Sequence, residues 1–140
     1  MPDFEAHATC RAPAVEPWKL LYDPSRFPEW WVGTARVEQG DGDAVTRYME
    51  AWPDFAYPTQ ITRHSDGSRI VVSCLLSNIV HEWSLTPAPE GCVVHVRVEL
   101  PEEEEHRLDA VKAEVIPSLR RLVELAESGH HASAATGAPA

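Results

Sequence analysis

The sequence predicts an α+β fold in which seven antiparallel strands form one sheet and the chain ends in a long helix. Three observations lead to this prediction. Runs of alternating apolar and polar residues, typical of strands, fill most of residues 4–100. The turns between these runs are too short for the crossovers that parallel strands need, so the pairing should be antiparallel. After Pro101 the apolar spacing changes to three and four residues, which indicates a helix.

The first strand is predicted at residues 4–10, and short helices should follow at residues 15–22 and 26–31. Asp-Gly turns within residues 40–43 and 65–67 are typical of hairpins. The remaining six strands are predicted at residues 34–39, 44–52, 57–64, 68–76, 79–86 and 92–100.

The last predicted element is a helix over residues 102–127, which opens with an acidic run that suits the N-terminal end of the helix dipole. Pro117 removes one backbone hydrogen bond, so we expect a bend or break there. Gly129 should end the helix. We therefore predict one domain over residues 1–128 and a disordered tail over residues 129–140.

Composition excludes several classes of function. The 140 residues carry a net charge of −10 and show no basic patch, which argues against nucleic acid or an anionic membrane as partner. No apolar run approaches the roughly 20 residues of a membrane-spanning helix, and the first residues do not resemble a secretion signal. We therefore expect a cytoplasmic protein without membrane insertion.

Motifs for cofactors and metals are missing from the sequence. It has no phosphate-binding glycine loop, no Gly-x-Ser-x-Gly, no His-Glu-x-x-His and no Cys-x-x-Cys. Cys10, Cys74 and Cys92 lie far apart in strand patterns and are predicted to be reduced, buried thiols. We expect neither a metal nor a cofactor.

Two segments near the N-terminus resemble a known family. Residues 12–23 (APAVEPWKLLYD) and 27–31 (FPEWW) are similar to the opening of the polyketide cyclase/dehydratase branch of the START-like (SRPBCC, Bet v 1-like) superfamily. The resemblance continues through residues 82–87 and Gly91 into the final helix, and covers residues 3–128. It implies a helix-grip fold, in which a curved sheet wraps around the last helix and leaves a cavity for a hydrophobic ligand. Members include aromatase/cyclases, lipid and hormone binders, and plant allergens.

His81 is the first candidate for chemistry. Apolar residues occupy the odd positions of residues 79–85 and should face inward, which places His81 on the same face. A histidine in an apolar cavity would stay neutral and could exchange a proton with a phenol or ketone. Alternatively, His81 is a packed core residue or lies on the outer face.

Arg63 is the second candidate, and it rests on the resemblance. The aromatase/cyclase branch presents a serine and an arginine, two residues apart, on the strand before a hairpin. Arg63 has a comparable position, but Ile61 stands where the serine would be. An inward guanidinium could stabilise an enolate. The alternative is an ordinary surface arginine.

Aromatic residues supply the candidate ligand-binding surface, since the chain has five tryptophans. We expect Trp18 and Trp31 to pack in the core, as the other aromatic residues also could. For the strand over residues 44–52 two faces compete for the interior, Tyr48 with Glu50 or Arg47 with Met49. The candidate ligand-binding residues are Phe27, Trp30, Tyr48, Trp52, Ile61, Trp83, Val111 and Val115.

The leading functional hypothesis is a cofactor-free protein, a monomer or homodimer, that binds a hydrophobic, aromatic or polyketide-like molecule. In an enzyme version, a lyase-like protein, His81 or Arg63 would assist cyclisation or dehydration of the molecule. In a carrier version the same cavity holds the ligand without turnover. A third possibility is a protein-interaction module of the same fold.

Overall fold

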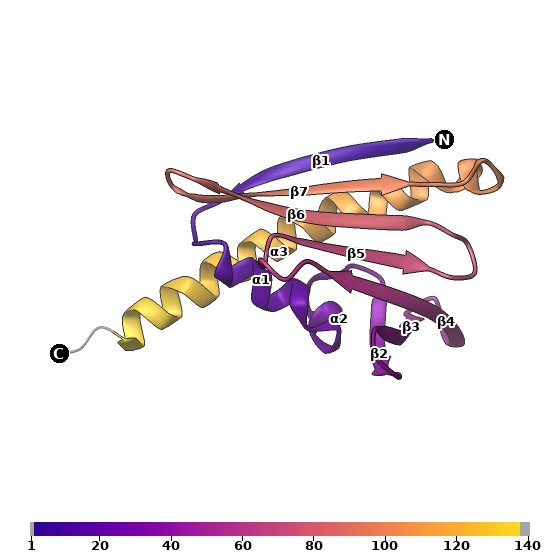
Figure 1. Cartoon of the computed structure of the whole chain (residues 1–140), viewed down its shortest axis with the longest axis horizontal. Coiled ribbons are helices and arrows are strands. Elements are labelled where there is room, and N and C mark those ends of the chain that lie inside the picture. The colour runs from indigo at the N-terminus through magenta and orange to yellow at the C-terminus, as the bar shows by residue number, and fades with distance from the viewer. Residues whose placement is uncertain (1, 138–140) are drawn as a thin grey trace.

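The computed structural model describes residues 2–137, with side chains described as far as residue 130. Its elements follow the predicted order, and Figure 1 shows the sheet with the long helix packed along it. The strands are β1 (Asp3–Cys10), β2 (Thr34–Gln39), β3 (Ala44–Met49), β4 (Trp52–Arg63), β5 (Arg69–Cys74), β6 (Val80–Ala88) and β7 (Gly91–Glu99). The α-helices are α1 (Val15–Tyr22), α2 (Phe27–Trp30) and α3 (Leu108–Gly137), and 3-10 helices occupy Pro24–Arg26 and Glu102–Arg107.

All seven strands belong to one antiparallel sheet with the order β1-β7-β6-β5-β4-β3-β2. The first strand pairs with the last, and the other neighbours are joined by hairpins or short loops. Helix α3 packs against β1 and α1. The predicted helix-grip α+β fold is therefore confirmed.

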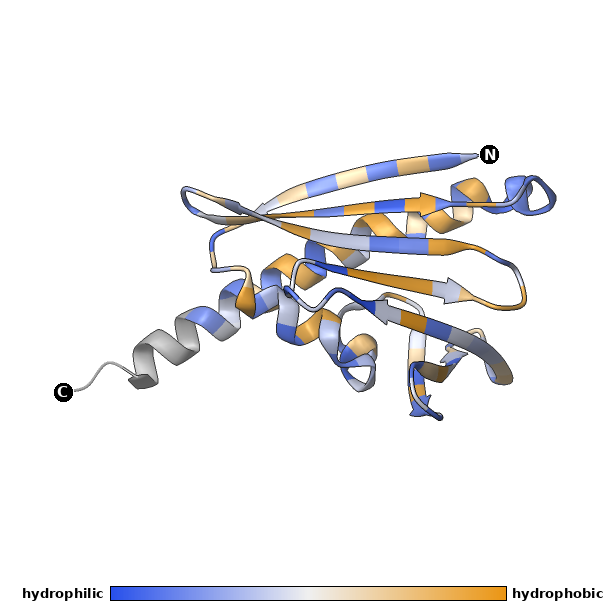
Figure 2. Ribbon diagram, viewed as in Figure 1, coloured by the Kyte–Doolittle hydropathy of each residue, from blue (hydrophilic) through white to orange (hydrophobic). Residues whose placement is uncertain are grey.

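The inner face of the sheet carries the core. Residues alternate between hydrophobic and hydrophilic along β1 and β7 (Figure 2), as expected for strands with one face buried. On β6, His81, Trp83 and Leu85 are buried, as predicted from their spacing. The inner residues of β7 and the position after it are fully buried, again as predicted: Cys92, Val94, Val96, Val98 and Leu100.

An aromatic cluster fills the space between α2 and the sheet. The Trp30 ring stacks on Trp31 at 5.1 Å between centroids and meets the Trp83 ring edge-to-face at 4.9 Å. Phe27 also packs against both of the α2-region tryptophans. The Trp30 Nε1–H donates to the Leu20 carbonyl at 3.0 Å, which satisfies its polar atom inside the core. The cluster therefore packs the α2 region against β6.

Helix α3 differs from the prediction at two points. It passes through Pro117 without a break and runs beyond Gly129 to Gly137. A glycine within a helix costs only about 1 kcal/mol, and the alanine-rich residues after it favour helix. The predicted tail over residues 129–140 is thus helical as far as Gly137, and residues 138–140 lie outside the described residues.

The turn after β3 also differs from the prediction. The predicted strands over residues 44–52 and 57–64 leave the turn to residues 53–56, with Pro53 at its start. The turn lies instead at Glu50 and Ala51, and Pro53 belongs to β4. Proline is tolerated in a strand where its missing N–H has no ladder partner. Pairing of β4 with β5 begins only at Thr59, so one side of this part of β4 is free of pairing.

Candidate functional site

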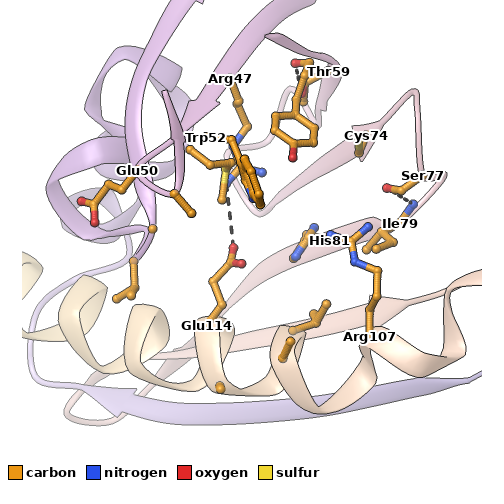
Figure 3. A pocket seen from close by; sticks show the side chains of 18 residues that line it. Arg47, Glu50, Trp52, Thr59, Cys74, Ser77, Ile79, His81, Arg107 and Glu114 are labelled. Carbon is orange, nitrogen blue, oxygen red and sulfur yellow. Dashed lines mark hydrogen bonds and ion pairs between the residues drawn. The ribbon is translucent and has the colours of Figure 1, made fainter. Parts of the chain in front are cut away.

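A cavity of about 580 Å³ lies between the N-terminal part of α3 and the inner face of β3–β6. Its apolar wall includes Val32, Met49, Trp52, Ile79 and Val111. Its polar side chains include Arg47, His81 and Glu114, which come from β3, β6 and α3 and project into the same space (Figure 3). The size falls in the range of small-molecule sites.

Arg47 occupies the inner position of β3 that the sequence left open between two faces. Its side chain is 8% exposed, and one Nη atom donates to the Thr34 hydroxyl at 2.7 Å. The guanidinium lies over the Trp31 ring, 4.1 Å from the centroid, which gives a cation–π contact. Burial lowers the pKa of Arg47, and the nearby Glu114 carboxylate opposes that shift. Arg47 Nε is buried without a hydrogen-bond partner among the described residues.

Glu114 faces Arg47 from α3. One carboxylate oxygen accepts a hydrogen bond from Trp31 Nε1 at 2.8 Å, and the same oxygen lies 3.9 Å from an Arg47 Nη atom. Burial raises the pKa of Glu114, while Arg47 and the Trp31 hydrogen bond act in the opposite direction. The carboxyl group is therefore poised to take up a proton more readily than a surface glutamate.

His81 completes the polar group from the central strand β6. Its ring meets the edge of Trp31 at 4.9 Å, and its Nε2 atom is buried without a hydrogen-bond partner among the described residues. Burial, with a smaller effect from the Arg47 charge, lowers the pKa of His81 to about 3. The imidazole is therefore neutral near pH 7 and retains a free lone pair or N–H for a ligand.

This depressed pKa predicts a pH dependence of stability. Unfolded His81 binds a proton as the pH falls through its ordinary pKa of 6.5, whereas folded His81 stays neutral down to about 3. The stabilising contribution is complete above pH 6.5 and is lost as the pH falls towards about 3. Relative to His81→Leu, the wild-type free energy of unfolding should fall by about 1.4 kcal/mol per pH unit below about pH 6. Urea unfolding of both proteins at several pH values measures this difference. If the free energies of unfolding of the two proteins changed in parallel with pH, the prediction would be wrong.

The structure places the predicted ligand-binding residues in three different settings. Trp52 and Val111 line the cavity together with His81. Tyr48 lies on the outer side of β3, where Arg36 stacks on its ring at 3.7 Å and Glu38 accepts its hydroxyl hydrogen bond. The other candidates are buried in the hydrophobic core and do not line the cavity: Phe27, Trp30, Ile61, Trp83 and Val115.

Arg63 is not brought to the cavity. It lies at the end of β4 beside α1, where its Nε donates to the Tyr22 carbonyl at 2.9 Å. Its guanidinium also lies 4.9 Å from the centre of the Tyr22 ring and forms an ion pair with Asp43 at 3.4 Å. These contacts tie β4 to α1, so the structure gives Arg63 an anchoring position.

Sequence reasoning underrated Arg47 and missed Glu114. A signal for Glu114 was present, since it lies three residues after Val111 and four before Ser118, on the buried stripe of α3. A carboxylate on such a stripe indicates a buried partner. For Arg47, the alternation with the buried Val45 on the same strand was the available signal.

The sequence of the chain matches a known family. The sequence profile described as polyketide cyclase/dehydrase and lipid transport matches residues 1–127. The chain belongs to this family. Comparison of the cyclase/dehydrase-family chain with curated proteins gives no match.

Solved structures agree on the fold of this polyketide cyclase/dehydrase-family chain. Protein NE0264 from Nitrosomonas europaea has a TM-score of 0.72 at 12% identity, with 91% of this chain and 95% of that chain covered. The di-domain aromatase/cyclase BexL of the BE-7585A pathway has a TM-score of 0.75 at 17% identity, with 91% and 47% covered. StfQ of the steffimycin pathway, also a di-domain aromatase/cyclase, has a TM-score of 0.69 at 18% identity, with 90% and 50% covered. The present chain thus spans about half of each di-domain protein.

Two features are absent from the described residues. None of their helices has the length and apolar character needed to cross a membrane. They also contain no cluster of three or more histidine, cysteine or acidic residues arranged to hold a metal ion.

Proposed function

We propose that this protein binds a hydrophobic, aromatic or polyketide-like small molecule in the cavity and promotes its cyclisation or dehydration. The observation that carries the proposal is a largely apolar cavity whose polar side chains converge at one place, Arg47, Glu114 and His81. Apolar walls bind a ring system, and a few placed polar groups orient it. The family match and the aromatase/cyclase fold relatives support the same substrate class.

The chemistry follows from the charges of the three groups. Cyclisation and dehydration of a carbonyl compound both require removal of a proton beside the carbonyl and stabilisation of the resulting oxyanion. Neutral His81 can accept or return that proton, and the Arg47 guanidinium can stabilise the negative oxygen. This assignment gives Arg47 the role that the family resemblance suggested for Arg63. Arg63 is instead hydrogen-bonded to the Tyr22 carbonyl and paired with Asp43.

The first experiment is native mass spectrometry of the protein as purified, followed by extraction and identification of any bound molecule. We expect one aromatic or polyketide-like molecule per chain, or uptake of such a molecule from a panel of polyphenols and fatty acids. An empty protein that ignores the panel would contradict the proposal and favour a protein-interaction module.

A His81→Leu variant then separates enzyme from carrier. If His81 moves a proton, the variant retains the ligand but loses about 100-fold or more of turnover, the usual effect of removing a general acid or base. Arg63→Lys is the matched control, because it changes a charged residue outside the cavity and should leave turnover unchanged. Equal turnover of wild type and His81→Leu would refute the catalytic role and leave the carrier version.

A further inference from the structure

Arg47 has more hydrogen-bond donors than the protein uses. A guanidinium offers five N–H groups, and burial without acceptors is costly. Among the described residues only the Thr34 hydroxyl accepts a hydrogen bond from this side chain. The Trp31 ring beneath the guanidinium stabilises its charge but offers no oxygen acceptor. The Nε donor is buried without a partner in the described part of the chain, and donors on the Nη atoms remain available where Arg47 lines the cavity wall.

Glu114 does not supply the missing acceptors. Its nearer oxygen lies 3.9 Å from the Arg47 Nη atom, beyond hydrogen-bond distance, and is already bonded to Trp31. A paired arginine and carboxylate normally approach to about 2.8 Å, often through two parallel hydrogen bonds. This pair, drawn as a dashed line in Figure 3, balances the charge of Arg47 but leaves most of its donors without an acceptor among the described residues.

On the basis of the proposed function, we infer that the cavity ligand is a carboxylic acid with an apolar or aromatic body, whose carboxylate binds Arg47. A carboxylate presents two oxygens at the spacing of the guanidinium donors, so it satisfies several of them at once. The neutral His81 ring, which lines the same cavity, can donate a further hydrogen bond to it. The apolar wall formed by Met49, Ile79 and Val111 then contacts the body of the ligand.

A second carboxylate beside Glu114 would place two negative charges next to one arginine. The charge is balanced if Glu114 takes up a proton when the acid binds, and its burial already favours the neutral form by raising its pKa. Binding should therefore consume about one proton per ligand. The other titratable or charged side chains of the cavity wall are Glu50 on the turn after β3, Tyr57 on β4, Cys74 on β5, His81 on β6 and Arg107 in the 3-10 helix before α3.

The test compares 2-naphthoic acid with 2-naphthamide, which has nearly the same shape but no charge. Isothermal titration calorimetry in two buffers of different ionisation enthalpy gives both affinity and proton uptake. We expect the acid to bind at least about tenfold more tightly than the amide at pH 6. Its affinity should fall as the pH rises, because the required proton becomes harder to obtain.

Two variants assign the effect to the proposed residues. Arg47→Met should abolish the preference for the acid while the amide still binds. Glu114→Gln keeps an oxygen for Trp31 and should abolish proton uptake without weakening the acid, and it tests the inference even if Arg47→Met does not fold.

Each result bears on a different claim. Equal affinity for acid and amide would overturn the inference and leave the proposed function standing. Binding of neither probe would count against both. Unchanged proton uptake in Glu114→Gln would overturn the role of Glu114 in charge balance.

Discussion

Gly91→Ala should lower the free energy of unfolding by about 4 kcal/mol or more, which is a large part of the stability of a typical domain. Gly91 lies in the hairpin between β6 and β7 with φ of +149°. A Cβ atom at this position would lie 2.4 Å from the Cys10 carbonyl oxygen and 2.5 Å from that of Ala12. Both are backbone atoms at the end of β1, so relief of the clash requires the paired strands to separate.

Gly42→Ala is the matched control, because Gly42 also has a positive φ, of +58°, but a Cβ atom there meets nothing within 4 Å. It should lower the free energy of unfolding by only about 1 kcal/mol, the ordinary cost of alanine in the left-handed backbone conformation. Urea unfolding followed by tryptophan fluorescence measures both variants. A Gly91→Ala protein as stable as Gly42→Ala would show that the hairpin does not approach β1 as closely as the structure has it.

The fold could be predicted because its signals are local and repeated. Alternation along β6 and β7 assigns the inner face of each strand, and Asp-Gly turns set the limits of two hairpins. The end of α3 was mispredicted because Gly129 is a helix stop only when no good helix formers follow it, and alanines do. The turn after β3 was placed at residues 53–56 and lies at residues 50–51, because Pro53 is a strong turn signal that an unpaired strand segment also tolerates.

The site was harder to predict because it depends on contacts between distant elements. His81 follows from alternation within one strand, whereas the partnership of Arg47 and Glu114 requires β3 and α3 to meet across the cavity. Composition suggested that aromatic residues line the ligand site, yet most of them fill the core. A tryptophan on a sequence does not reveal whether its ring faces another ring or an open space, and only packing decides this.

Trp30 and Trp52 allow this distinction to be tested with one substitution made at two positions. Trp30 is fully buried in the aromatic cluster, whereas Trp52 is 65% exposed on the cavity wall. Trp30→Ala removes a packed ring and leaves the Leu20 carbonyl without its donor, so the free energy of unfolding should fall by about 3–5 kcal/mol. Trp52→Ala should change it by no more than about 0.5 kcal/mol, because little of its surface is buried.

Ligand binding should respond in the opposite way. Loss of the Trp52 ring removes apolar contact from the cavity wall, and we expect about tenfold weaker binding of 2-naphthamide. The Trp52→Ala protein must unfold at the wild-type urea concentration for this loss to count as a binding effect. If Trp52→Ala bound the probe as tightly as wild type, the exposed tryptophan would lie outside the bound ligand's reach. If Trp30→Ala were as stable as Trp52→Ala, the ring cluster would not be the part of the core that holds α2 against the sheet.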